Sequence, residues 1–311
     1  MEEGAGLFEK IDITKYPVKK LVAIPLIILL IALAVLTYTQ LSVDSPVRLG
    51  MDFKGGTWVK VSTDETREEL TAKFSPFPVI LVASTGVGNE KRIEFDLTGG
   101  SQEYDQLIDL LNTEYGVGTY RIESISPVFG KQYQTQTLWA LGIAFILMAI
   151  VVFVVFVTFV PSFAVVMSAF SDIVIAVACM DLIEMELSLG TVAALLMLIG
   201  YSVDSDILLT RNLLHKKGDL NEKIRNTMRT GITMTSTTLS AIFAMFVVSF
   251  YIGIPILKNI SIVLLFGLVM DLMNTWLFNA GVLRWYIERK EKKRYVKRDV
   301  GKAKKSGNKK K

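Results

Sequence analysis

The chain has 311 residues, 51% of them hydrophobic, and a net charge of +4 at pH 7. With a mean hydropathy of +0.43 and its apolar residues gathered in long blocks, the chain is too apolar to be a soluble protein built on one core. The sequence therefore predicts a polytopic α-helical membrane protein. Its one cysteine, Cys179, lies in an apolar block and excludes an intramolecular disulfide.

Six blocks are long enough to cross a bilayer, which takes about 20 apolar residues in a helix. They are predicted at 21–39, 138–160, 162–183, 189–210, 232–252 and 256–283. The first is too long for the apolar part of a secretory signal and is interpreted as a retained signal anchor. Between the second and third spans, Phe159-Val160-Pro161-Ser162 is predicted to form a tight turn, because Pro161 can end one helix and begin the next.

Basic residues are concentrated in three segments: 1–20, the loop after the fourth span, and the tail at 284–311. With six spans these segments lie on one side of the membrane, and the positive-inside rule predicts that both termini are cytoplasmic. The expected location is the cell membrane. The tail is predicted to contact anionic lipid headgroups, or a ribosomal or cytoplasmic partner, and no nucleic acid is expected as a ligand.

The polar segment 42–135, between the first and second spans, is predicted to be an α+β domain on the extracytoplasmic side. Strands are expected at 57–62, 78–83, 92–97 and 119–125, and helices at 63–74 and 101–112. Thr63 and Ser101 are the predicted N-caps of the two helices. The resulting order of strand, helix, strand, strand, helix, strand is ferredoxin-like. The alternative is a spacer with no binding role.

Two carboxylates lie near the middle of the fourth span, in Gly200-Tyr201-Ser202-Val203-Asp204-Ser205-Asp206. An ionised carboxylate at that depth costs roughly 2.5 to 3.5 kcal/mol, so each is a candidate functional group. Because Asp204 and Asp206 are two residues apart on a helix, they point in nearly opposite directions, and only one is expected to face Arg229 at the start of the fifth span. The alternative is that both acids only hydrogen-bond to neighbouring helices and hold the bundle together.

Other polar residues in the spans extend this hypothesis. The fifth span carries hydroxyl residues at spacings of three and four, predicted to face the bundle interior: Thr233, Ser236, Thr237 and Ser240. A buried carboxylate takes up or releases a proton as an arginine moves away or approaches. Asp204, Asp206, Arg229, Asp172 and Asp271 are therefore candidate proton-relay residues, and for Asp172 and Asp271 a structural role is an equal alternative.

The chain carries no nucleotide-binding motif, since Gly55-Gly56 and Gly99-Gly100 are typical turn glycines and not a phosphate-binding loop. If the protein does work, the energy must therefore come from a partner or from an ion gradient. No cofactor or metal is expected.

Three passages resemble a known family. Gly50-Met51-Asp52-Phe53-Lys54-Gly55-Gly56-Thr57 is similar to a signature that follows the first span in that family. The fourth-span residues from Thr191 through Gly200-Tyr201-Ser202-Val203, and Arg229-Thr230 with Thr235-Ser236-Thr237-Thr238, resemble two further motifs. Together they cover about residues 15–290 and identify a resemblance to the SecF branch of the SecD/SecF protein-export family, in the resistance-nodulation-division superfamily.

The resemblance implies a non-enzymatic accessory subunit of the Sec translocase. Such a subunit works with SecD and the SecYE translocon, and uses the proton gradient to promote preprotein translocation or release at the outer face. Asp52, Gly55 and Gly56, with Gly200, Ser202 and Ser205, fall on motif positions of the family. The family's arginine falls on Arg229 and its third-span acid on Asp172. Bacterial members carry an acid at the position of Ser205, so Asp204 and Asp206 on either side indicate an archaeal-type member and leave the proton-carrying acid open.

Three alternatives to this function follow from the same features. The first is half of a proton-coupled exporter of small molecules, and the second is a scaffold for the translocon that transports nothing. An intramembrane aspartyl protease is disfavoured, because the chain lacks both Gly-x-Gly-Asp and Tyr-Asp.

Overall fold

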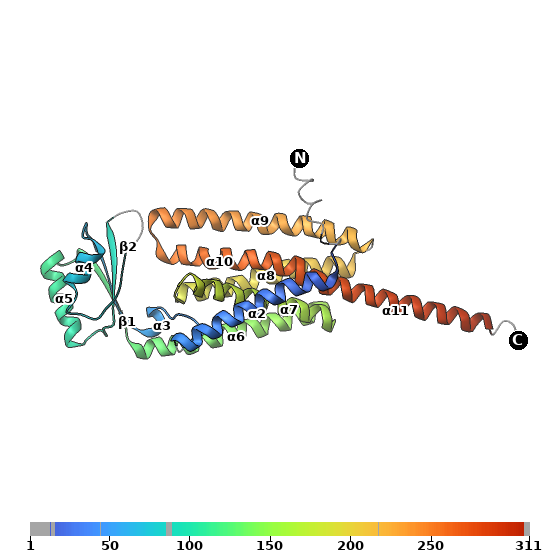
Figure 1. Cartoon of the computed structure of the whole chain (residues 1–311), viewed down its shortest axis with the longest axis horizontal. Coiled ribbons are helices and arrows are strands. Elements are labelled where there is room, and N and C mark those ends of the chain that lie inside the picture. Colours follow the sequence, from blue (N-terminus) through green and yellow to red (C-terminus); the bar gives the residue numbers. More distant parts are fainter. Residues whose placement is uncertain (1–12, 14–15, 44, 85–88, 217, 308–311) are drawn as a thin grey trace.

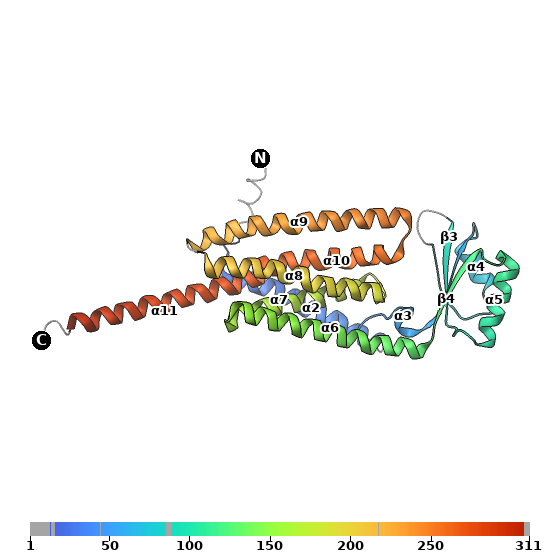
Figure 2. The ribbon, with the colours of Figure 1, turned by 180° about the vertical axis from the view of Figure 1, so that it is seen from behind.

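The computed structural model describes residue 13 and residues 16–43, 45–84, 89–216 and 218–307. The molecule is elongated, with a small α+β domain at one end, a helical bundle in the middle and a single helix projecting from the other end (Figure 1). The view from behind shows the same three parts (Figure 2).

The six predicted spans are confirmed as six long apolar helices within the described residues. They are α2 (Val18–Val43), α6 (Pro127–Phe156), α7 (Phe159–Leu182), α8 (Leu189–His215), α9 (Leu220–Ile252) and α10 (Pro255–Met273). The last span continues through a π-helical turn, η2 (Asn274–Asn279), into the projecting helix α11 (Ala280–Gly307). Helices α6 and α9 begin before the predicted apolar blocks, at the N-caps Ser126 and Asp219, because polar residues extend both helices beyond the membrane-spanning part.

The predicted turn at Phe159-Val160-Pro161-Ser162 is wrong. The chain reverses at Val157, which has a left-handed backbone with φ of 51°, and at Thr158, the extended N-cap of α7. Pro161 is consequently the third residue of α7. A proline is tolerated there because the first four N–H groups of a helix have no acceptor within it.

Helices α7 and α8 form the centre of the bundle, while α6 and α9 lie at its margin with most of their apolar surface uncovered. Helices α8 and α10 approach closely because Gly267 has no side chain. A Cβ at that position would lie 2.4 Å from Leu198 Cδ2. The close contact places one face of α8 directly against α10 and the turn that follows it.

The α+β domain is ferredoxin-like, as predicted. Its sheet contains β1 (Gly56–Ser62), β2 (Val79–Ser84), β3 (Glu90–Phe95) and β4 (Tyr120–Ile125), in the order β2-β3-β1-β4 with every neighbouring pair antiparallel. Helices α4 (Arg67–Lys73) and α5 (Gln102–Tyr115) cover the face that points away from the bundle (Figures 1 and 2). The core between the layers contains Leu70, Phe74, Leu107 and Leu111 from the helical side.

The predicted start of the first domain helix at Thr63 is wrong. Thr66 is the N-cap, and its hydroxyl accepts a hydrogen bond from Glu69 N while the Glu69 carboxylate accepts one from Thr66 N. This reciprocal pair is a capping box. Thr63 instead hydrogen-bonds to Glu65 in the preceding loop. The predicted N-cap of the second helix, Ser101, is confirmed.

The other face of the sheet points toward the bundle and is charged. It carries three ion pairs, Lys60–Glu90, Arg92–Glu94 and Arg121–Glu123. The guanidinium of Arg92 also lies 5.0 Å from the ring centroid of Trp58. Because strand side chains alternate between the two faces, these charged residues occupy the positions between the core residues.

Candidate functional site: a buried acid cluster

Three carboxylates from three helices meet inside the bundle. Asp172 lies on α7, Asp206 on α8 and Asp271 on α10, and their exposed fractions are 0%, 0% and 1%. The central position of α7 and α8, together with the close α8–α10 contact, excludes solvent and lipid from this point. We call Asp172, Asp206 and Asp271 the acid cluster.

Asp172 is held by two neutral donors. The hydroxyl of Ser202 on α8 donates to Asp172 Oδ2 over 2.6 Å, and Asn274 Nδ2 donates to Asp172 Oδ1 over 2.6 Å. Each carboxylate oxygen therefore has one donor. Asp172 thereby connects α7 to α8 and to the turn η2.

Asp206 and Asp271 share a donor. The hydroxyl of Thr275 lies 2.8 Å from Asp206 Oδ1 and 3.2 Å from Asp271 Oδ1, and Asn279 Nδ2 donates to Asp206 Oδ1 over 2.8 Å. The hydroxyl of Ser205 lies 3.1 Å from each oxygen of Asp271. Since a hydroxyl has one proton, Thr275 can serve only one of the two acids at a time.

The π-helical turn η2 supplies most of these donors. Asn274, Thr275 and Asn279 all lie in it, and all three are fully buried. A π-helix closes its hydrogen bonds over five residues and not four, and such turns occur frequently at functional sites. The wider turn allows residues five apart, Asn274 and Asn279, to reach two different acids of the cluster.

Several buried polar atoms around the cluster have no hydrogen-bond partner among the described residues. They include Asp206 Oδ2, Asn274 Oδ1 and Asn279 Oδ1. Within the residues that the structure describes, no lysine, arginine or histidine forms an ion pair with any of the three acids. Burying an unpaired charge is costly, and none of the three carboxyl groups has a basic partner among the described residues.

The structure separates the two acids of the fourth span. Asp206 is buried in the cluster, whereas Asp204 lies on an exposed stripe of α8 that includes Gly200 and Tyr201. This opposite orientation agrees with their spacing of two residues. Ser202 and Ser205 lie on the buried face and contact the cluster.

The prediction that the hydroxyl stripe of α9 faces the bundle interior is wrong. Thr233, Ser236, Thr237 and Ser240 are exposed, and the hydroxyls of Thr233, Thr237 and Ser240 donate to backbone carbonyls of α9 itself. The buried face of α9 is the opposite one, because Met228, Gly231 and Thr235 pack toward the bundle. Arg229 is also exposed, so the structure does not bring it to the cluster.

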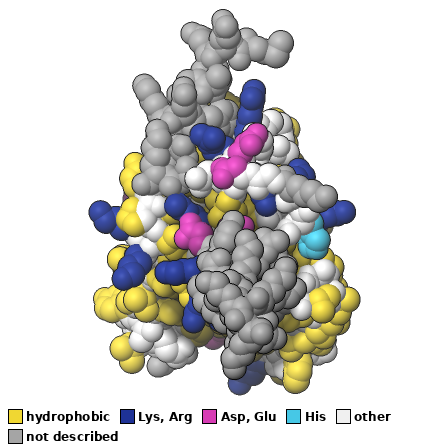
Figure 3. Space-filling model, turned by 90° about the vertical axis from the view of Figure 1, so that its right-hand side faces the viewer, with side chains coloured by type: hydrophobic (Ala, Val, Ile, Leu, Met, Phe, Trp, Pro, Cys, Tyr) yellow, Lys and Arg dark blue, Asp and Glu magenta, His cyan; other side chains and the backbone are white. Residues whose placement is uncertain are grey.

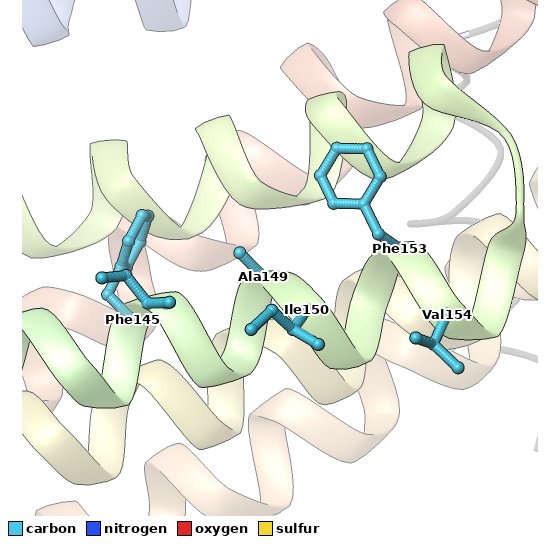
Figure 4. A pocket seen from close by; sticks show the side chains of 6 residues that line it. Phe145, Ala149, Ile150, Phe153 and Val154 are labelled. Carbon is cyan, nitrogen blue, oxygen red and sulfur yellow. The ribbon is translucent and has the colours of Figure 1, made fainter.

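A different hollow lies on the outer surface of α6. It is lined by Phe145, Ala149, Ile150 and their neighbours up to Val154, all from one helix and all apolar (Figure 4). Ile150 and Val154 are 54% and 71% exposed. This surface is suited to lipid chains and carries no polar group that selects a ligand.

Comparison with known proteins identifies the family. Residues 108–289 match the family model described as "Protein export membrane protein SecD/SecF, C-terminal". The chain is 45% identical over 278 residues to the protein-export membrane protein SecF of Methanolacinia petrolearia, covering 89% of this chain and 97% of that protein. The chain belongs to the SecD/SecF protein-export family. The SecF protein of Haloferax volcanii is 43% identical over 277 residues, covering 89% of this chain and 95% of that protein.

The archaeal sources of these SecF relatives agree with the predicted archaeal type. The fold also matches the crystal structure of SecDF, a translocon-associated membrane protein, from Thermus thermophilus, with a TM-score of 0.70 and 20% identity. That match covers 87% of this chain and 38% of the SecDF chain. This member of the SecD/SecF family therefore spans about two fifths of the length of SecDF.

The three η2 residues that donate to the acids of this SecD/SecF-family site were not predicted as relay residues: Asn274, Thr275 and Asn279. Thr275 contacts two of the three acids, although Asp271 was the only residue of its span predicted as a relay residue. A signal was present, because Asn274 and Thr275 follow Asp271 closely in an otherwise apolar span and polar residues inside spans are often functional.

Proposed function

We propose that this protein is the SecF-type subunit of a protein-export complex and that it couples proton movement through the acid cluster to preprotein translocation or release at the outer face. The single observation that carries the proposal is three carboxylates buried together inside a membrane bundle, with only neutral partners among the described residues. A purely structural cluster needs no acids, because Ser or Asn connects helices at lower cost.

The hydrogen bonds of the cluster support proton carriage because donors are fewer than acceptors. Ser205 Oγ lies 2.9 Å from Ser202 O, 3.1 Å from both oxygens of Asp271 and 3.2 Å from Thr275 Oγ1. Its single proton can satisfy one of these acceptors well. A proton on Asp271 or Asp206 would turn that acid into a donor and complete the network, so gain and loss of a proton would rearrange bonds on α8, α10 and η2.

The charge distribution supports an orientation with both termini in the cytoplasm. The end of the bundle opposite the α+β domain is rich in lysine and arginine (Figure 3). The described basic residues there include Lys19, Lys20, Arg211, Lys216 and Arg225. By the positive-inside rule this end faces the cytoplasm, which places the α+β domain on the extracytoplasmic side, where preproteins emerge.

SecD is the proposed membrane partner, and the exposed polar residues of α8 and α9 are its proposed docking face. An exposed carboxylate at Asp204 and an exposed stripe of hydroxyls on α9 are costly against lipid. Small hydroxyl residues suit close helix–helix contact in membranes. A chain that spans 38% of SecDF leaves room for such a partner. Arg229 is assigned to the same face.

The complex would act beside the SecYE translocon, with the proton gradient as its energy source. Each proton crossing about 100 mV releases about 2.3 kcal/mol, so a few protons per cycle suffice to move a domain. No cofactor enters the proposal. The basic tail is assigned to anionic lipid headgroups on the cytoplasmic side.

The test measures preprotein release from vesicles that contain translocon, SecD and this chain, with and without an imposed proton gradient. Asp172→Asn, Asp206→Asn and Asp271→Asn are compared with wild type. Asp109→Asn, in an exposed acid of α5, is the matched control. We expect at least one cluster variant to lose the gradient-dependent part of release while Asp109→Asn keeps it.

Two further variants test the docking face. Asp204→Asn and Arg229→Met are expected to weaken co-purification with SecD while the fold is retained. If every cluster variant releases preprotein like wild type, the acids are structural and the protein is a scaffold. If release is lost only where SecD no longer co-purifies, assembly and not proton movement explains the effect.

A further inference from the structure

The segment that joins the α+β domain to the bundle is fastened to the helix that carries the cluster. We propose that Asp52 couples α8, and with it the acid cluster, to the α+β domain. This inference deepens the proposed function and rests on it. We call residues 48–56 the strap; they include α3 (Met51–Lys54), the single helical turn before β1.

The strap pairs with the loop between α7 and α8 through its backbone. Leu49 forms a parallel bridge with Leu187: Gly50 N donates to Leu187 O over 2.8 Å, and Leu187 N donates to Arg48 O over 2.7 Å. A Cβ on Gly50 would lie 2.8 Å from Leu187 O. The close approach of the two backbones therefore requires glycine at this position.

Asp52 then reaches the first turn of α8. Its Oδ2 accepts a hydrogen bond from Leu189 N over 2.8 Å. Leu189 is the first residue of α8, whose own N-cap, Ser188, accepts from Thr191 N. The first N–H groups of a helix lack internal acceptors, and a negative charge there is favoured by the helix dipole. Asp52 is thus an N-terminal cap supplied from outside the helix.

The far end of the strap leads directly into the sheet. Gly55 and Gly56 have φ of 82° and 130°, and β1 starts at Gly56. The strap also touches α6, because Gln134 Nε2 donates to Phe53 O over 2.7 Å. Few freely rotating residues therefore separate the Asp52 contact from the first strand of the domain.

Helix α8 connects this contact to the cluster. From Leu189 to Asp206 the helix rises about 25 Å at 1.5 Å per residue, and it has no proline to bend it. Helix α7, which carries Asp172, is fastened to the strap too, at its C-terminal end and in the loop that follows. Arg48 Nε lies 3.7 Å from Asp181 Oδ1 at the end of α7, and Arg48 Nη1 lies 3.2 Å from Glu184 Oε1 in the loop. A tilt or shift of α8 caused by proton exchange at the cluster is consequently passed to β1 through Asp52.

Amide hydrogen exchange tests the coupling without any transport assay. Exchange of residues 48–56 and of the first turn of α8 is measured for the full-length chain, Asp206→Asn, Asp52→Ala and the double variant, with Asp109→Ala as the control. Asp52→Ala alone should speed exchange of the first turn of α8 about tenfold, because a hydrogen bond to a charged group is lost. Asp52→Asn keeps an acceptor and should show a smaller change.

The decisive comparison is the effect of Asp206→Asn in two backgrounds. We expect it to change exchange of the strap several-fold when Asp52 is present and less than about twofold when Asp52 is replaced by alanine. An equal change in both backgrounds would show that another route connects the cluster to the domain. No change in either would show that no coupling exists.

The release assay separates this inference from the proposed function. If Asp206→Asn loses gradient-dependent release and Asp52→Ala behaves like wild type, the proposed function stands and the coupling role of Asp52 is refuted. If Asp206→Asn releases preprotein normally, the proposed function fails, and the exchange data still decide whether Asp52 connects the cluster to the strap.

Discussion

Replacing Gly130 with alanine should destabilise the junction between the α+β domain and the bundle. Gly130 lies in α6 and faces the strap, where a Cβ would lie 2.6 Å from Phe53 O and 2.9 Å from Phe53 C. Ordinary contacts are about 3.5 to 4.0 Å, and both clashing atoms are backbone, so the strap must move by nearly 1 Å. Such overpacking costs about 1 to 3 kcal/mol.

Two smaller free-energy contributions also affect the stability of Gly130→Ala. The hydrogen bond from Gln134 to Phe53 O would be stretched or lost, which adds about 1 kcal/mol. Alanine in a helix gains about 1 kcal/mol over glycine. The two terms offset, and the expected loss of unfolding free energy for Gly130→Ala stays at about 1 to 3 kcal/mol.

Gly142→Ala is the matched control on the same helix. Gly142 is exposed, and a Cβ there meets nothing within 4 Å, so only the helix-propensity gain remains. Thermal unfolding of the detergent-purified protein, followed by tryptophan fluorescence, should separate the two variants by about 4 to 8 °C, taking about 2 °C per kcal/mol. Equal melting temperatures for both variants would refute the close contact between α6 and the strap.

Three further predictions concern the stability of the α+β domain and are tested by amide hydrogen exchange in its strands and helices. Leu107→Ala removes a fully buried side chain and should cost about 2 to 5 kcal/mol; wild-type exchange in β1 and β3 would refute this. Thr66→Ala removes the cap of α4 and should cost about 1 kcal/mol, whereas Thr66→Ser should retain stability. Burial opposes ionisation of Glu65, but hydrogen bonds from Lys73 and Tyr115 lower the pKa of Glu65 below its usual 4.5. The stabilisation is therefore present above pH 4.5 and lost as pH falls through the lowered folded-state pKa, and Glu65→Gln should remove this acid dependence of exchange in α4.

Hydropathy and alternation predicted the spans and the domain well, because both signals depend on local composition. About 20 apolar residues need a bilayer wherever the helix packs, and the alternation in β1 needs a core on one side. The boundaries were less predictable. Thr63 and Thr66 are both sound N-caps by residue type, and only the reciprocal bond with Glu69 selects the second.

The orientation of side chains within the membrane was the part that sequence could not settle. The stripe on α9 was predicted to face inward because its hydroxyl residues share one side of the helix, yet the apolar face around Met228 packs inward. For Asp172 and Asp271, a proton-relay role and a structural role were equal alternatives. Their meeting with Asp206 depends on the π-helical turn and on the close approach at Gly267, and neither can be read from periodicity.

The charged face of the sheet has a consequence for how the domain behaves next to a lipid surface. Its three basic residues, Lys60, Arg92 and Arg121, are each paired with a glutamate, so this face has no net charge from these pairs. A face of unpaired basic residues would gain about 1 kcal/mol for each one held near anionic headgroups. Here the headgroups' attraction to each basic residue is offset by their repulsion of its paired glutamate. The two charges of a pair lie only a few ångströms apart, well inside the screening length of about 8 Å at physiological salt. These three pairs therefore give the sheet face little electrostatic adhesion to a lipid surface, and we expect any contact of this face with lipid to be insensitive to lipid charge and to ionic strength.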